Sequence, residues 1–144
     1  MSAERRAMNA EIIDEFRANS GVVGGPFDGT PLLLLTTTGA RSGELRTMPL
    51  TYRRDGDDRL VVFAANGGRP NHPGWLHNVL ADPGVTVEVG DQRFAATAHI
   101  AEGPERDRLW FATLAVMPLL ADFETRAGDR VIPVVVLVRS ARPR

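Results

Sequence analysis

The sequence predicts a mainly β protein, an antiparallel barrel with α-helices at its periphery. Six short runs of apolar and β-branched residues are spread over residues 32–138. Two of the connections between them, Asp55-Gly56 and Gly90-Asp91, carry hairpin signals. Strands and helices do not alternate regularly, which argues against a doubly wound parallel sheet and favours the barrel.

The N-terminal segment predicts an amphipathic helix over Ala3–Ala18. Apolar side chains recur there at a spacing of four, at Met8, Ile12 and Phe16, and residues 19–21 end the helix. Such a helix can cover the core or lie on a membrane surface, and its charges of mixed sign favour the first. We therefore expect a helix within residues 1–20, followed by residues 21–144, in a single domain overall.

The remaining elements follow from short apolar runs and from proline and glycine positions. The expected strands are Leu32–Thr37, Thr47–Tyr52, Arg59–Ala64, Val85–Val89, Arg93–Ile100 and Val131–Val138. Prolines that suit a first helical turn predict three further helices, His72–Ala81, Pro104–Val116 and Pro118–Arg126.

The overall composition is that of a globular protein without a strong field. The chain has 144 residues, 43% hydrophobic and 24% charged, and a net charge of −1, so nothing global attracts nucleic acid. It has no cysteine, which excludes disulfides and thiolate chemistry, and all seventeen basic residues are arginine. No signal peptide or bilayer-spanning run is present, so the expected location is the cytoplasm.

Side chains for acid–base or metal chemistry are sparse. Ser42 lies in a turn without the G-x-S-x-G pattern of a nucleophile elbow. His72 and His77 are five residues apart, which is not the spacing of a helical metal pair, and His99 lies in an expected strand. We therefore expect no metal. Binding residues without evident acid–base machinery suit an enzyme whose cofactor supplies the reactivity.

The turn in the stretch LTTTGARSGELRTMPL, residues 35–50, has two interpretations. Its backbone N–H groups, the Ser42 hydroxyl and the Arg41 guanidinium can converge on a phosphate or carboxylate. Arg46, at the start of the returning strand, could close the same pocket. The alternative is an ordinary hairpin tip with exposed arginines, which this stretch alone favours.

The stretch AANGGRPNHPGWLHN, residues 64–78, combines glycine with polar and aromatic side chains. Two glycines after a strand allow the backbone to approach a ligand closely. Fixed polar contacts are offered by Asn66, Asn71, His72 and Asn78. Trp75 offers a large flat apolar surface, although a tryptophan that caps the core is the more ordinary interpretation.

Together, the two stretches resemble the deazaflavin-dependent nitroreductase family, split-barrel reductases that use coenzyme F420. The residues that carry the resemblance are TTxGxxSGxxRxxPL, NGGxxxHPxWxxN and the final DRVIPVVVL, within residues 31–137. The resemblance implies a six-stranded split β-barrel related to flavin-binding barrels. It also implies an 8-hydroxy-5-deazaflavin in a groove, with its phosphate and oligoglutamate tail toward the arginine-bearing turn.

The resemblance also assigns the expected cofactor-binding residues. Arg41 and Ser42 fall where the family grips the phosphate region, the ring would lie beside residues 64–68, and Trp75 and Asn78 would support it. The full expected set is Thr38, Gly39, Arg41, Ser42, Arg46, Met48, Pro49, Ala64, Ala65, Asn66, Gly67, Gly68, His72, Trp75 and Asn78.

One segment departs from the family pattern. Some members look tyrosine-rich before the last strand, whereas this chain has Met117, Leu120 and Phe123, which we expect to line an apolar acceptor site. The departure puts reduction of bicyclic nitroimidazoles in doubt and favours quinones or enones. Tyr52, the only tyrosine, is a weak candidate for the proton donor, with water as the other.

The expected function is transfer of a hydride from reduced deazaflavin to an electron-poor quinone, enone or nitro compound. Two alternatives stay open, the same barrel using FMN and a non-catalytic flavin- or deazaflavin-binding protein. A homodimer and a weak membrane-surface contact through the N-terminal helix are further expectations about partners.

Overall fold

The computed structural model describes residues 2–140, so residues 141–144 of the predicted domain lie outside the described part. The elements in chain order are α1 (Ala3–Ala18), the 3-10 helix η1 (Gly25–Phe27), β1 (Leu32–Thr38), β2 (Leu45–Thr51), β3 (Arg53–Arg54), β4 (Arg59–Phe63), the 3-10 helix η2 (Asn66–Gly68), α2 (Gly74–Ala81), β5 (Gly84–Val89), β6 (Gln92–Ile100), α3 (Gly103–Leu114), α4 (Leu119–Ala127) and β7 (Val134–Arg139).

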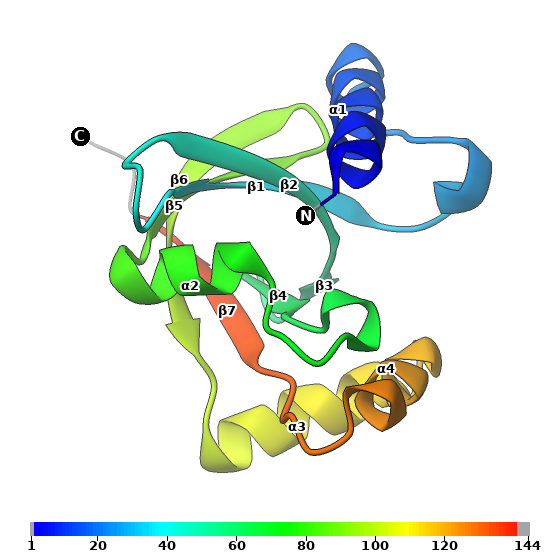
Figure 1. Cartoon of the computed structure of the whole chain (residues 1–144), viewed down its shortest axis with the longest axis vertical. Coiled ribbons are helices and arrows are strands. Elements are labelled where there is room, and N and C mark those ends of the chain that lie inside the picture. The colour runs from blue at the N-terminus through cyan, green and yellow to red at the C-terminus, as the bar shows by residue number, and fades with distance from the viewer. Residues whose placement is uncertain (1, 141–144) are drawn as a thin grey trace.

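The seven strands form one antiparallel sheet that curls into a barrel (Figure 1). Their order across the sheet is β2-β1-β5-β6-β7-β4-β3. The strands at the two ends of this order, β2 and β3, are separated in the chain by Tyr52 alone, so the sheet closes back on itself there. The predicted antiparallel barrel with peripheral helices is confirmed.

Several element boundaries differ from the sequence-based expectation. The strand expected at Thr47–Tyr52 is β2, Leu45–Thr51, and an additional two-residue strand, β3 at Arg53–Arg54, makes seven strands instead of six. The second helix begins at Gly74, after Pro73 as its N-cap. The last strand begins at Val134 because Pro133, which has no N–H, cannot donate to a strand ladder.

Alternation along β1 explains why four consecutive leucines are all buried. Leu33 and Leu35 point into the barrel, while Leu32 and Leu34 point outward and pack against Ile12 and Phe16 of α1. The amphipathic face of α1 therefore covers the outside of the barrel. The same division occurs in β4 and β7, whose outward residues Val61, Val134 and Val136 pack against α3 and α4.

The helices lie at different places around the barrel. Figure 1 shows α1 beside β2 at one end of the molecule and the α3–α4 pair at the other, with α2 across the barrel between them. Trp75, Leu76 and Val79 of α2 join the cluster inside the barrel. No helix within residues 2–140 has the length and apolar character needed to cross a bilayer.

Candidate functional site

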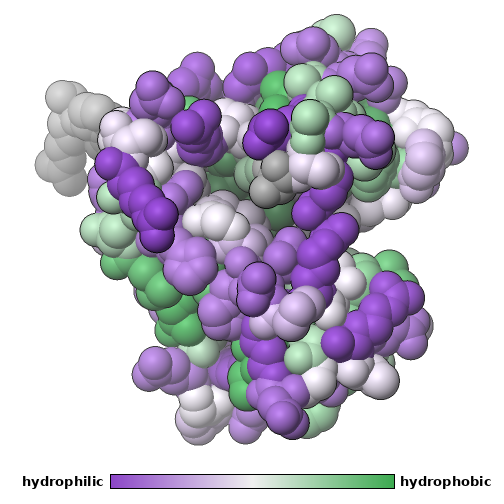
Figure 2. All heavy atoms as spheres, viewed as in Figure 1, coloured by the Kyte–Doolittle hydropathy of each residue, from purple (hydrophilic) through white to green (hydrophobic). Residues whose placement is uncertain are grey.

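A groove formed by two adjoining cavities runs between α1, β2 and α2. The first, here called the turn cavity, has a volume of about 570 Å³ and is lined by Gly39, Ala40, Arg41, Ser42, Arg46, Gly74, His77 and Asn78. The second, the helix cavity, has a volume of about 540 Å³ and shares Arg46, Gly74 and Asn78 with the first. Figure 2 shows this part of the surface hollowed, with hydrophilic side chains around the rim.

The β1–β2 turn is held in one conformation by its own hydrogen bonds. The Gly39 N–H donates to the Glu44 carbonyl at 2.7 Å, and the Gly43 N–H donates to the Gly39 carbonyl at 2.9 Å. A Cβ on Gly39 would lie 2.6 Å from the Ser42 Oγ and 3.1 Å from the Glu44 carbonyl oxygen, so any other residue here would displace the serine side chain. Because the Glu44 N–H donates to the Ser42 Oγ at 3.1 Å, the serine side chain also stabilises the turn.

The tip of the same turn keeps donors available for an anion. Within the described residues, the N–H groups of Arg41 and Ser42 make no hydrogen bond and the Arg41 guanidinium makes no ion pair. The guanidinium of Arg46 pairs with the Glu44 carboxylate at 3.1 Å, although both side chains are well exposed. An exposed pair of this kind contributes little to stability, so an anionic ligand can replace Glu44 at low cost.

Asn78 fastens the turn to α2. Its Oδ1 accepts from the Ala40 N–H at 3.0 Å, and its Nδ2 donates to the Thr37 Oγ1 at 3.0 Å. Thr37 is only 1% exposed, so this amide reaches from the groove to the buried wall of the barrel. The sequence predicted that Asn78 supports the cofactor ring, whereas its amide holds the turn in place.

The helix cavity lies along the outer edge of β2. Within the described residues, β2 pairs with β1 on one side only, and α1 lies along the other side. Proline within a sheet is confined to such edges, which agrees with Pro49 in β2. The barrel side of the cavity includes Met48 and Trp75, and the α1 side consists of Arg6, Asn9, Ala10 and Ile13.

The loop after β4 is organised by Arg130, which sequence analysis did not single out. Its guanidinium donates to the carbonyls of Ala64, Ala65 and Arg69 at 2.6 to 3.1 Å, and contacts the His72 Nδ1 at 2.9 Å. Since a guanidinium can only donate, His72 Nδ1 must accept, and its proton lies on Nε2. Burial, then the charge of Arg130, lowers the pKa of His72, so the ring stays neutral near pH 7.

The predicted cofactor-binding residues of this loop lie beside α4. Ala64 and Ala65 are buried in two different core clusters, and Gly68 is buried as well. A Cβ on Gly68 would lie 2.6 Å from the Arg126 Cβ and 2.9 Å from the Phe123 carbonyl, so glycine permits this close packing. None of the loop residues 64–72 lines the turn cavity or the helix cavity. Their contact with a cofactor therefore stays a prediction.

The expected acceptor residues are placed differently from one another. Leu120 is 1% exposed in the cluster between the barrel and α3–α4, where an acceptor cannot reach it. Phe123 packs partly buried against that cluster, and Met117 is partly exposed. Tyr52 packs against the cluster inside the barrel, and neither it nor Thr38 lines the turn cavity or the helix cavity.

The structure brings together several residues that the sequence analysis did not predict. The α1 residues of the helix cavity form pairs three or four residues apart, Arg6 with Asn9 and Ala10 and these two with Ile13, so they share one side of the helix. His77 lines the turn cavity one residue before Asn78. The sequence contained the helical spacing of the α1 residues, but nothing in it indicated that this side of α1 faces a cavity.

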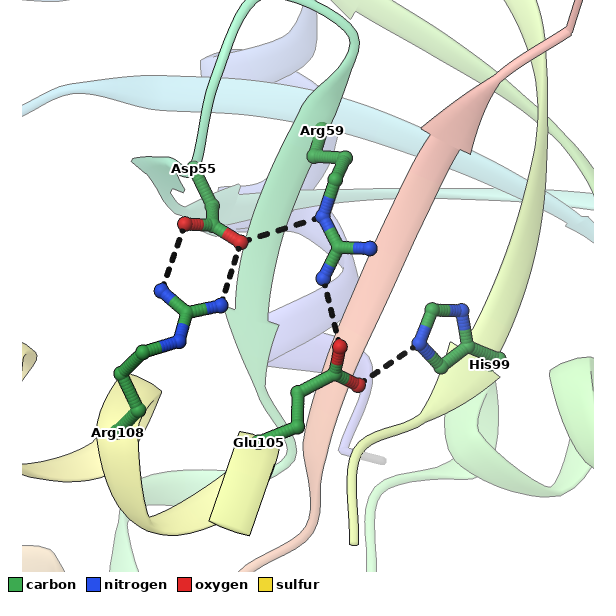
Figure 3. A network of polar contacts seen from close by, with 5 residues as sticks. All are labelled: Asp55, Arg59, His99, Glu105 and Arg108. Atoms are coloured by element: carbon green, nitrogen blue, oxygen red, sulfur yellow. Dashed lines mark hydrogen bonds and ion pairs between the residues drawn. The ribbon is translucent and has the colours of Figure 1, made fainter.

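A second polar cluster lies on the barrel away from the groove (Figure 3). Asp55 accepts from Arg108 at 3.0 and 3.1 Å and from Arg59 at 3.2 Å, while Glu105 contacts Arg59 at 2.9 Å and His99 at 3.0 Å. These contacts join α3 to β4 and β6. The hydrogen bond from Arg108 lowers the pKa of Asp55, and the hydrogen bond from His99 lowers that of Glu105.

The groove fits the anionic deazaflavin that the sequence resemblance implies. The turn cavity supplies two arginines and unpaired backbone N–H groups, which are donors for phosphate or carboxylate oxygens. The helix cavity continues from it and is lined by Met48 and by the small accessible part of Trp75, which is 5% exposed, and an apolar surface of this kind suits a flat aromatic ring. Each volume lies in the range usual for small-molecule sites.

Comparison with known proteins agrees with this fit. The sequence model of a family described as F420H(2)-dependent quinone reductase matches residues 9–139. The F420H(2)-dependent quinone reductase of Mycobacterium tuberculosis strain H37Rv is 42% identical over 128 residues, which cover 86% of this chain and 85% of that protein.

Solved structures give the same result. A structure described as an F420-H2 dependent reductase (FDR-A) superimposes with a TM-score of 0.67 at 39% identity, covering 74% of this chain and 93% of that one. A second, described as a domain-swapped dimer, has a TM-score of 0.70 at 36% identity, covering 92% and 96% of the two chains.

Proposed function

This chain belongs to the F420H(2)-dependent quinone reductase family, and on that premise we propose how its residues serve the reaction. It is an oxidoreductase whose cofactor is coenzyme F420 and whose reaction passes a hydride to a quinone. The predicted enzyme class and cofactor, and the quinone among the predicted acceptors, are confirmed. The individual binding residues are the proposal.

We propose that the turn cavity binds the anionic part of the cofactor. The observation that carries this assignment is the β1–β2 turn, where Arg41, Ser42 and Arg46 line one cavity and where, within residues 2–140, the N–H groups of Arg41 and Ser42 make no hydrogen bond. Charge-assisted hydrogen bonds of this kind are each worth about 1.5–3 kcal/mol. Asn78 contributes indirectly, because it fixes the turn against α2.

We propose that the cofactor ring extends from there into the helix cavity. When bound, reduced F420 would supply a hydride, and a quinone that takes up this hydride and one further proton would become a quinol. The chain contributes position and exclusion of water, with Met48 and Trp75 on the barrel side and α1 opposite. Tyr52 stays a weak candidate for the proton donor, since it lines neither cavity.

The oligomeric state of the protein and its location in the cell stay predictions. A homodimer is supported by the solved relative that is described as a domain-swapped dimer. A weak membrane-surface contact through α1 would rely on Met8, which is 52% exposed, because Ile12 and Phe16 pack against the barrel. A cytoplasmic location is likewise proposed from the sequence.

The assignment is tested by titrating the purified protein with F420 and with FMN in a calorimeter. We expect F420 to bind at least about tenfold more tightly than FMN, and reduced F420 to be consumed when menadione is added. Tighter binding of FMN would overturn the cofactor assignment. Tight F420 binding without turnover of menadione or any other quinone would instead identify a carrier of the cofactor.

A further inference from the structure

Helix α1 presents two different sides to the rest of the molecule. One side, with Ile12 and Phe16, is buried against the outward leucines of β1. The other side, here called the groove side, consists of Arg6, Asn9, Ala10 and Ile13 and lines the helix cavity. Ile13 also packs against this buried cluster, so packing against the barrel explains the first side and contributes to Ile13, whereas Arg6, Asn9 and Ala10 call for a separate account.

The C-terminal part of α1 is firmly attached to the barrel. Arg17 donates to both carboxylate oxygens of Glu88 in β5, at 2.9 and 3.1 Å. Just beyond the helix, Gly21 passes so close to the β5–β6 turn that a Cβ on it would lie 2.7 Å from the Gly90 Cα. These contacts set the direction of α1, and they place its groove side opposite β2.

The groove side faces a cavity whose opposite surface is built by other elements. Met48 and Trp75 come from β2 and α2, and we assigned them to the cofactor ring. Ala10 and Ile13 add a small apolar surface on the α1 side, while Arg6 and Asn9 add hydrogen-bond donors. An apolar surface with a few donors suits a flat hydrophobic molecule that carries carbonyl oxygens, which is the chemistry of a quinone.

Asn9 has the geometry to contact such a carbonyl. Its Nδ2 donates across the cavity to the Met48 Sδ at 3.7 Å. A thioether sulfur is a weak acceptor, and a quinone oxygen is a stronger one. A carbonyl oxygen that enters the cavity would therefore be a better acceptor for Nδ2 than the sulfur.

We propose that the groove side of α1 is the quinone-selecting wall of this reductase, with Ala10 setting the space available and Asn9 Nδ2 donating to a quinone carbonyl. The proposal rests on the function proposed above. It also moves the predicted acceptor site from the α3–α4 segment, where Leu120 is buried in the core, to the N-terminal helix.

The test compares Ala10→Phe with the matched control Ala7→Phe. Both alanines are exposed on α1, and Ala7 lines neither cavity. Menadione is titrated into the protein saturated with oxidised F420, which cannot reduce it, and its binding is measured by equilibrium dialysis. We expect Ala10→Phe to raise the Kd for menadione about tenfold and Ala7→Phe to change it less than about twofold.

Two further measurements complete the experiment. Asn9→Leu, which keeps the side-chain volume and removes the donor, should raise the Kd for menadione about fivefold. In Ala10→Phe and Asn9→Leu the Kd for F420 should rise by a smaller factor than the Kd for menadione, in Ala7→Phe it should change by less than about twofold, and the melting temperatures of all three should match that of the wild type.

The outcomes separate this proposal from the proposed function. Unchanged menadione binding in Ala10→Phe and Asn9→Leu would overturn the quinone-selecting wall. A larger loss of F420 than of menadione would also overturn it, because α1 would then face the cofactor. In both cases the wild type would still reduce menadione with reduced F420, and only a wild type that does not would count against the proposed function.

Discussion

Replacing Asn78 with alanine should loosen the β1–β2 turn and lower the stability of the whole barrel. The change removes two hydrogen bonds, one to the exposed Ala40 N–H and one to the hydroxyl of Thr37, which is 1% exposed. Water can replace the first partner, at a cost near 0.5 kcal/mol, while the buried hydroxyl loses about 1–3 kcal/mol. We expect the free energy of unfolding to fall by about 2 kcal/mol.

The assay is urea denaturation of the wild type, Asn78→Ala and Asn78→Asp, followed by titration with F420. In Asn78→Asp the carboxylate can still accept from Ala40 and from the Thr37 hydroxyl, so its stability should stay near that of the wild type. Its added negative charge beside the turn cavity should nevertheless weaken F420 binding about tenfold. An Asn78→Ala variant as stable as the wild type would refute the view that this amide holds the turn.

Three further predictions concern charge, pH and the acceptor. Arg41→Ala should weaken F420 binding about tenfold at low salt and less at high salt, while the exposed Arg54→Ala should not, and calorimetric titration at two salt concentrations would show whether the two differ. The pKa values of Asp55 and Glu105 are lowered in the folded state, so the stability they contribute is present above about pH 4 and is lost as the pH falls through the folded pKa values. Urea midpoints should therefore fall on acidification more steeply in the wild type than in Asp55→Asn/Glu105→Gln, and parallel curves would contradict this. Since the acceptor is proposed to lie against α1, Phe123→Tyr should leave the ratio of the kcat/KM for a bicyclic nitroimidazole to that for a quinone unchanged, and a raised ratio would return the acceptor to the α4 side.

Much of the fold could be predicted because the sequence pattern is local. The helix at Ala3–Ala18 has the predicted bounds, and each expected strand is present. The additional strand β3, just after Tyr52, could not be predicted, because it forms by pairing with β4 whereas β2 pairs with β1. Strand pairing depends on segments that are distant in the chain, so it cannot be predicted from the periodicity of a short stretch.

The candidate site was predicted in part, because only some of its residues are close together in the sequence. The turn residues Arg41, Ser42 and Arg46 are adjacent in sequence, and they line one cavity. Arg130 could not be recognised, because its four partners lie 58 to 66 residues earlier in the chain. The spacing of three between Leu120 and its apolar neighbours Met117 and Phe123 is compatible with a ligand surface and with a core. In the structure Leu120 belongs to the core cluster that also contains residues of α3.

The open outer edge of β2 has a consequence for how the protein behaves in solution. An unpaired strand edge is a template on which a second chain can add its own strand, which is a common beginning of aggregation. In this protein α1 lies along that edge, and Pro49 removes one of its donors. A chain truncated before residue 21 would expose both the edge and the outward leucines of β1. Helix α1 therefore protects the barrel from self-association as well as bounding its groove.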